Sequence, residues 1–153
     1  MSIIKKPSIW GKPLWDILHY VTFTYCPETQ SKNMKLLFEK HLLNLMPCRK
    51  CRENYKEHLK KVPIRLESKE SLSKWLVKIH NLVNITKSNP TRKHTYTEVK
   101  RRYDPLLSKT RVVESFLHWS CLMRPNILAA SIDIQRSYSF FMSFVFQSSF
   151  SYS

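Results

Sequence analysis

Two cysteines, Cys48 and Cys51, are separated by two residues and follow directly after Pro47. Thiols at this spacing can close a short disulfide with little backbone movement, and thiol–disulfide exchange can open it again. The residues that follow favour a helix, so we expect the pair at a helix start, where free N–H groups and a partial positive charge stabilise a thiolate. Arg49 and Lys50, between the cysteines, act in the same direction. The pair indicates a redox active site, with a zinc knuckle and a structural disulfide as the alternatives.

A second group of polar residues lies in segments that otherwise read as apolar helices. His80 and Asn84 are one helical turn apart, with Asn81 beside them, and Trp15 and His19 have the same spacing in an earlier segment. Polar side chains among buried residues need hydrogen-bond partners. Those partners are either one another, in a polar core, or a bound cofactor, and the spacing alone leaves both interpretations open.

Five helices, over residues 12–25, 31–46, 48–61, 69–87 and 97–107, are predicted to position these side chains. Apolar residues recur at spacings of three and four within them, and short segments containing proline, serine or asparagine separate them. Helices with apolar stripes and short connections favour an all-α fold. We therefore predict a four-helix bundle with a short fifth helix.

The C-terminal part of the chain, residues 111–153, differs from the first 110 residues in composition. It carries three of the 26 basic residues and two of the 11 acidic ones, and serine and aromatic residues dominate it. Its longest apolar run, residues 140–146, contains a serine and is too short to span a bilayer, so no transmembrane segment is expected. We predict a domain over residues 1–110 followed by an accessory or loosely ordered, poorly defined tail over residues 111–153.

The composition limits the classes of partner and cofactor. A formal net charge of +15 favours anionic partners, but no stretch interleaves basic and aromatic residues as a nucleic-acid-reading module does, so nucleic acid is not the expected partner. Gly11 is the only glycine, which excludes a Walker loop and a glycine-rich dinucleotide fingerprint. Any nucleotide cofactor must therefore be held by side chains on helices. The first twelve residues hold no apolar signal region, so we expect a protein that is not secreted.

Three segments, in the order WGKPLWDILHY, MPCRKC and WLVKIHNLVN, resemble the Erv/ALR family of FAD-dependent sulfhydryl oxidases. The family has a GRxxW–xxLH element, a PCxxC element and an HNxVN element in this order on successive helices, and the resemblance covers about residues 10–107. The residues that match are Gly11, Lys12, Trp15, Leu18, His19, Pro47, Cys48, Cys51, His80, Asn81, Val83 and Asn84. Three motifs in order are far more specific than a lone CxxC.

The resemblance implies a thiol oxidase whose helices hold FAD. A thiolate of a protein substrate attacks the Cys48–Cys51 disulfide at Cys48, Cys51 passes the electrons to the flavin, and oxygen receives them to give hydrogen peroxide. Cys48 and Cys51 are thus the predicted catalytic residues, and no metal is expected. The predicted cofactor-binding residues are Gly11, Lys12, Trp15, His19, Trp75, His80, Asn81, Asn84, Lys87 and Tyr103. Lys78, Arg101 and Arg102 are further candidates for the pyrophosphate.

Two departures from the family pattern bear on the partners. The second disulfide that closes the C-terminal region in many cellular relatives has no matching cysteines, a feature shared with small viral members. Cys26 and Cys121 are single thiols and provide no shuttle disulfide. We therefore predict a separate thioredoxin-like protein as electron donor. The resemblance also implies a homodimer in the cytoplasm (host cytoplasm or virion if the chain is virus-encoded), with the mitochondrial intermembrane space as the alternative.

Three other interpretations of the chain remain. A zinc module would use Cys48 and Cys51 with His58, His80 or His94, but the chain lacks a second closely spaced ligand pair. A basic, nucleic-acid-binding bundle rests on net charge alone. A redox-inert relative would keep the fold and the FAD site and serve as an interaction protein. The intact CxxC with its basic neighbours favours the enzyme.

Overall fold

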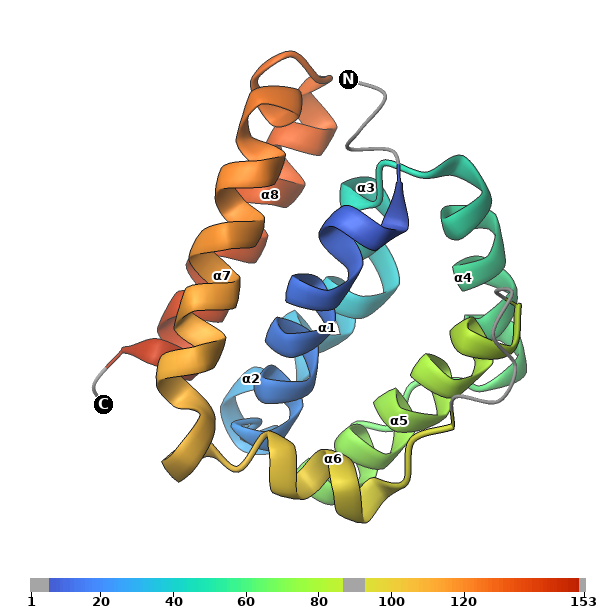
Figure 1. Cartoon of the computed structure of the whole chain (residues 1–153), viewed down its shortest axis with the longest axis vertical. Coiled ribbons are helices and arrows are strands. Elements are labelled where there is room, and N and C mark those ends of the chain that lie inside the picture. Colours follow the sequence, from blue (N-terminus) through green and yellow to red (C-terminus); the bar gives the residue numbers. More distant parts are fainter. Residues whose placement is uncertain (1–5, 87–92, 152–153) are drawn as a thin grey trace.

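The computed structural model describes residues 6–86 and 93–151, and these residues form helices without any β-strand (Figure 1). This confirms the predicted all-α class. The helices are α1 (Pro7–Phe23), α2 (Pro27–Leu36), α3 (Leu42–Leu45), α4 (Arg49–Lys61), α5 (Lys69–Thr86), α6 (Tyr96–Arg102), α7 (Pro105–Leu128) and α8 (Ile132–Val145). A π-helical turn, Leu37–His41, joins α2 to α3, and a second one, Phe146–Phe150, follows α8.

Prolines and polar caps set several helix starts. Pro7, Pro27 and Pro105 each occupy the first turn of a helix, where a missing N–H removes no hydrogen bond. The side chain of Asp104 accepts a hydrogen bond from the backbone N–H of Leu106 at the start of α7. Pro27 therefore begins the second helix four residues earlier than predicted, and the break at residues 103–104 divides the predicted fifth helix between α6 and α7.

Helix α1 lies at the centre of the molecule. It packs against α5 on one side and against α7 on the other, while α4 packs on α5 and α8 packs on α3 and α7 (Figure 1). The core contains many residues from α1, among them Ile17, Leu18 and Val21. The helix that carries two of the predicted cofactor-binding aromatic residues is thus held from both sides.

Residues 111–128 and 132–150 are helical and packed, so this part of the chain is not loosely ordered, while the alternative of an accessory segment stays a prediction. Five apolar side chains form one stripe along α7 and are buried, namely Val112, Phe116, Trp119, Met123 and Ile127. On α8, Phe141 and Val145 are completely buried. The serines and aromatic residues that made the segment look irregular lie on amphipathic helices, and the predicted boundary at residue 110 falls inside α7.

Within the residues that the structure describes, no helix combines the length and the apolar character needed to cross a membrane.

Candidate active site

Cys48 and Cys51 form a disulfide at the beginning of α4, with their Cα atoms 5.2 Å apart. Cys48 is the N-cap residue, and its Sγ accepts a hydrogen bond from the backbone N–H of Cys51 at 3.1 Å. Both cysteines are half-buried and pack against the hydrophobic core. The disulfide therefore lies in the positive field of a helix N-terminus while it stays partly accessible, as thiol–disulfide exchange requires.

The basic residues around the CxxC have different roles. Arg49 pairs with Glu53 at 3.1 Å on the exposed face of α4. The guanidinium of Arg52 donates a hydrogen bond to the carbonyl oxygen of Met46 at 2.6 Å. Arg52 thus ties the start of α4 to the end of the preceding helical segment, because Met46 immediately follows α3. It fixes the turn that presents the cysteines in addition to contributing positive charge.

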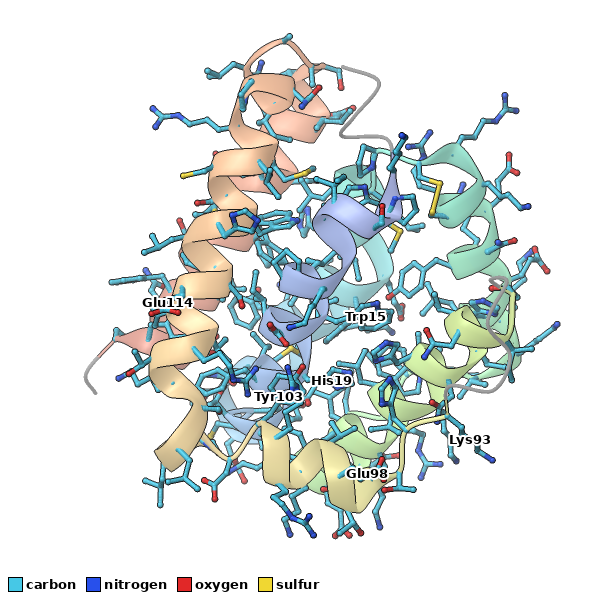
Figure 2. All side chains as sticks on the ribbon, viewed as in Figure 1. Trp15, His19, Lys93, Glu98, Tyr103 and Glu114 are labelled. Carbon is cyan, nitrogen blue, oxygen red and sulfur yellow. A yellow bond between two sulfur atoms is a disulfide. The ribbon has the colours of Figure 1, made fainter. Side chains whose placement is uncertain are left out.

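Five aromatic rings from α1, α5 and the segments beside α6 gather between α1 and α5. Trp15 stacks on His80 with ring centroids 3.8 Å apart and an interplanar angle of 8°. Nε2 of His19 lies 2.9 Å from Nδ1 of His80, at hydrogen-bond distance. The ring of Tyr103 stacks on His19 at 5.1 Å, and that of His94 lies 4.6 Å from His80. Figure 2 shows Trp15 and His19 on α1, with Tyr103 beside His19.

His19 is the most deeply buried member of this ring cluster. Burial, followed by the positive charges of His94 and Arg102, lowers its pKa from 6.5 to about 3. Its imidazole is therefore neutral at physiological pH. Its Nδ1 is buried and has no hydrogen-bond partner in the described part of the chain. A buried polar atom of this kind is a site at which a bound molecule gains a hydrogen bond.

Asn81 fixes the position of His94 through the backbone. Its side-chain nitrogen donates to the carbonyl oxygen of His94 at 2.9 Å, and its oxygen accepts from the N–H of His94 at 2.8 Å. This pair of hydrogen bonds joins α5 to the residue before the N-cap of α6. Asn84 lies one turn after His80 on α5 and is half-buried. The HNxVN segment therefore supplies one ring, His80, to the cluster and holds a second, His94, in place.

The remaining predicted cofactor-binding residues are placed as follows. Trp75 lies in the hydrophobic core, where its indole N–H donates to the Val62 carbonyl and its ring meets the edge of Phe38, so the structure does not bring it into the ring cluster. Gly11 is buried in α1, yet a Cβ built on it meets no described atom within 4 Å. Lys12 is exposed and pairs with Asp16 at 3.7 Å.

The predicted pyrophosphate ligands lie outside the ring cluster or outside the described part. Lys78 is exposed on α5 and Arg101 is exposed on α6. Arg102 is exposed too, but its guanidinium lies 5.7 Å from the centre of the Tyr103 ring. Lys87 lies outside the described residues. Among the described candidates, Arg102 is therefore the cation that contacts a ring of the cluster.

Sequence reasoning missed three residues around the ring cluster. The sequence suggested His94 only as a zinc ligand, although its ring lies against that of His80. Asp16 is buried next to Trp15, and Arg111 reaches it from α7. One signal was present for Asp16: it is the single acidic residue in an otherwise neutral run over residues 14–23, and a buried carboxylate requires partners. Nothing in the sequence identified Arg111 as one of them.

The chemistry of this cluster fits a flavin nucleotide. A flavin is a flat aromatic system with a hydrogen-bonding edge, and the site offers aromatic faces, the unpartnered Nδ1 of His19 and open space beside Gly11. Because Trp15 and His80 are in direct contact, a flavin ring has to lie beside this stack or separate it. Among the described residues, no three histidine, cysteine, aspartate or glutamate side chains are grouped as metal ligands.

The sequence profile of the Erv1/Alr family matches residues 12–104. The chain belongs to the Erv1/Alr family. The matched range holds the CxxC and all five rings, and it ends at the residue before α7. Helices α7 and α8 of this Erv1/Alr member therefore lie beyond the matched segment.

Curated relatives of this Erv1/Alr chain carry the name of a flavin-linked enzyme. It is 39% identical over 84 residues to a probable FAD-linked sulfhydryl oxidase, R368, of Acanthamoeba polyphaga mimivirus, a match that covers 52% of this chain and 59% of that protein. It is 37% identical over 78 residues to the FAD-linked sulfhydryl oxidase ERV1 of Arabidopsis thaliana, covering 48% of this chain and 40% of that protein.

The mitochondrial FAD-linked sulfhydryl oxidase ERV1 of Saccharomyces cerevisiae is 29% identical over 76 residues, which is 48% of this chain and 40% of the yeast protein. The chain thus spans between two fifths and three fifths of the length of these three relatives. No solved structure matches it.

Proposed function

We propose that this protein is an FAD-linked sulfhydryl oxidase that forms disulfide bonds in protein thiols. The observation that carries the proposal is the CxxC disulfide at the start of α4, in a chain that also gathers Trp15, His19 and His80 into one ring cluster. Family membership supports the same activity, since the curated relatives are named FAD-linked sulfhydryl oxidases.

The chain's own residues account for the thiol half of the reaction. A substrate thiolate attacks Sγ of Cys48, the Cys48–Cys51 bond breaks, and Cys51 leaves as a thiolate. A second substrate thiolate then attacks the mixed disulfide, which forms the substrate disulfide and releases Cys48. Two electrons have now moved from the substrate to the cysteine pair, and the N–H of Cys51 and the helix N-terminus stabilise negative charge on Cys48.

When bound, FAD supplies the two-electron oxidation that restores the Cys48–Cys51 disulfide and delivers the electrons to oxygen as hydrogen peroxide. Trp15, His19, His80 and Tyr103 are the proposed aromatic contacts for it, and Asn81 positions the nearby His94. Because His19 stays neutral, it offers Nδ1 as a hydrogen-bonding group without placing a charge in the site. Gly11, Lys12, Trp75, Asn81, Asn84 and Lys87 remain proposed cofactor-binding residues.

The partners and the compartment are predictions that follow from this activity. Protein thiols are the proposed substrates, and a separate thioredoxin-like protein is the proposed electron donor, because Cys26 and Cys121 provide no second redox pair. A homodimer and a cytoplasmic location, with the mitochondrial intermembrane space as the alternative, stay predictions. The relatives named above include both a viral and a mitochondrial protein.

The first test is a visible absorption spectrum of the purified protein before and after anaerobic dithiothreitol. We expect a flavin spectrum that bleaches on reduction in the wild type, and a flavin spectrum that dithiothreitol bleaches at least about a hundredfold more slowly in Cys48→Ser. The loss follows because a serine side chain forms no disulfide with Cys51 and offers no sulfur for a thiolate to attack.

Cys121→Ser is the matched control, since Cys121 is exposed on α7 and outside the CxxC. It should bleach like the wild type. A colourless protein that takes up no added FAD would refute the proposal. A yellow protein whose flavin dithiothreitol does not reduce would instead support the redox-inert, FAD-binding alternative.

A further inference from the structure

A buried carboxylate, that of Asp16, lies at the contact between α1 and α7. Asp16 follows Trp15 directly and precedes His19 by three residues, so it shares α1 with two members of the ring cluster. Its side chain is 4% exposed. An ionised carboxylate this far from water is tolerated only when charged or hydrogen-bonding groups surround it.

Within the described residues, four side chains from three parts of the chain surround this carboxylate. The hydroxyl of Tyr103 donates a hydrogen bond to Oδ1, and the hydroxyl of Ser115 donates to Oδ2 at 2.9 Å. The guanidinium of Arg111 lies 3.4 Å from Oδ1, and the ammonium of Lys12 lies 3.7 Å from Oδ2. Asp16 therefore links α1 to α7 and to the residue that ends α6.

Arg111 extends this network to the turn between α6 and α7. It donates a hydrogen bond to the carbonyl oxygen of Arg102, and its guanidinium lies 5.1 Å from the centre of the Tyr103 ring. Tyr103 is thus held from three directions: by Asp16 at its hydroxyl, by Arg111 over its ring, and by His19 through stacking at 5.1 Å. Burial, followed by the hydrogen bond to Asp16, raises the pKa of Tyr103 to about 12, so its hydroxyl keeps the proton that it donates.

We propose that Asp16 is a positioning residue for the flavin nucleotide, which acts by fixing the ring of Tyr103 against His19. This proposal rests on the proposed function, because it takes the ring cluster to be the FAD site. Arg111 and Ser115 lie on α7, beyond the segment matched by the family profile. Through these two residues, α7 helps to set the position of Tyr103 in that site. Of the four partners named above, Tyr103 is the one that belongs to the ring cluster.

The test is the dissociation constant for FAD, measured by flavin fluorescence on apoprotein, alongside the free energy of unfolding of the same apoproteins. We expect Asp16→Asn to raise the dissociation constant about tenfold or more, because Asn at this position cannot balance Arg111 and Lys12 and cannot accept on both sides. Glu114→Gln is the matched control. It removes one carboxylate charge from α7, at the residue before Ser115. Glu114 is exposed and points away from α1 (Figure 2).

Ser115→Ala keeps the test decisive if Asp16→Asn fails to fold. This change deletes one donor to Oδ2, and we expect a roughly two- to fivefold weaker FAD affinity. Its control is Ser120→Ala on the same helix, whose hydroxyl donates to the Leu117 carbonyl outside the network. Ser120→Ala should leave the affinity unchanged.

A double-mutant cycle identifies the residue through which Asp16 acts. If Asp16 acts through Tyr103, then Asp16→Asn in a Tyr103→Phe background should weaken FAD binding by much less than about tenfold. Variants that lower only the free energy of unfolding, with FAD affinity unchanged, would overturn the proposal and leave Asp16 a structural residue. A wild type that binds no FAD would overturn the proposed function and this inference together.

Discussion

The buried histidine His19 makes the stability of the protein depend on pH. Its pKa is 6.5 in an unfolded chain and about 3 in the folded protein, so the unfolded state binds the extra proton as the pH falls below 6.5. The stabilisation is therefore fully present above pH 6.5 and decreases progressively toward pH 3. Burial lowers the pKa of His41 and of His58 as well, and these shifts have the same sign.

We expect His19 alone to reduce the free energy of unfolding of the apoprotein by about 1.4 kcal/mol between pH 7.5 and pH 5.5. Urea denaturation of the wild type at the two pH values measures the total change. His19→Asn should lose about that much of the pH dependence, whereas His118→Asn, at an exposed position on α7, should keep it. An identical pH dependence in both variants would contradict the assignment to His19.

At the scale of the helix, the start of α6 is set by a capping box. The Thr95 side chain accepts from the N–H of Glu98, and the Glu98 carboxylate accepts from the N–H of Thr95, both at 3.2 Å. His94, which Asn81 holds, immediately precedes it. The cap thus fixes the short helix that leads to Tyr103.

Thr95→Ala should therefore lower the free energy of unfolding by about 1 kcal/mol, the usual cost of losing an N-cap side chain. Chemical denaturation gives this value directly. Thr97→Ala is the matched control, because Thr97 is exposed in the first turn of α6 and takes no part in the capping box. Equal losses in the two variants would show that the cap contributes nothing.

Apolar periodicity predicted most helices of the bundle, and the errors have physical causes. From the sequence, Pro27 is interpreted as the end of a helix, but proline is also well tolerated in the first turn of a helix, where it begins α2. Low charge and high serine content suggest a loose tail over residues 111–150, while the apolar stripe over residues 112–127 carries the helical signal.

In the candidate site, the family resemblance predicted Trp15, His19, His80 and Tyr103 among the cofactor-binding residues, and the structure brings their rings together. The role of these residues in FAD binding stays a prediction. The partners of Asp16 could not be predicted, because Arg111 and Ser115 lie 95 and 99 residues further along the chain. Such pairs depend on tertiary packing, which local spacing does not encode.

At the scale of the whole molecule, the segment that matches the family does not include α7, which packs along one side of α1. Helices α7 and α8 begin beyond it and bury large side chains such as Phe116, Trp119 and Phe141. Each buried apolar side chain of this size contributes about 2 kcal/mol, so the stripe on α7 contributes on the order of 10 kcal/mol, comparable to the whole stability of a domain.

A chain that ends at residue 104 should therefore lose cooperative unfolding. It would expose the face of α1 that α7 covers, and Asp16 would lose Arg111 and Ser115. Thermal denaturation followed by far-ultraviolet circular dichroism measures this. A shortened chain that unfolds in one sharp transition and binds FAD as tightly as the full chain would instead establish α7 and α8 as an accessory segment.

The four cysteines of the molecule differ in accessibility, and this difference has a practical consequence. Cys48 and Cys51 are joined, the thiol of Cys26 donates to Glu28 and is half-buried, and Cys121 is exposed on α7. In the oxidised protein a maleimide dye should therefore attach first at Cys121. A dye emitting where flavin absorbs would then report, by energy transfer, how far α7 lies from the cofactor, without any engineered cysteine.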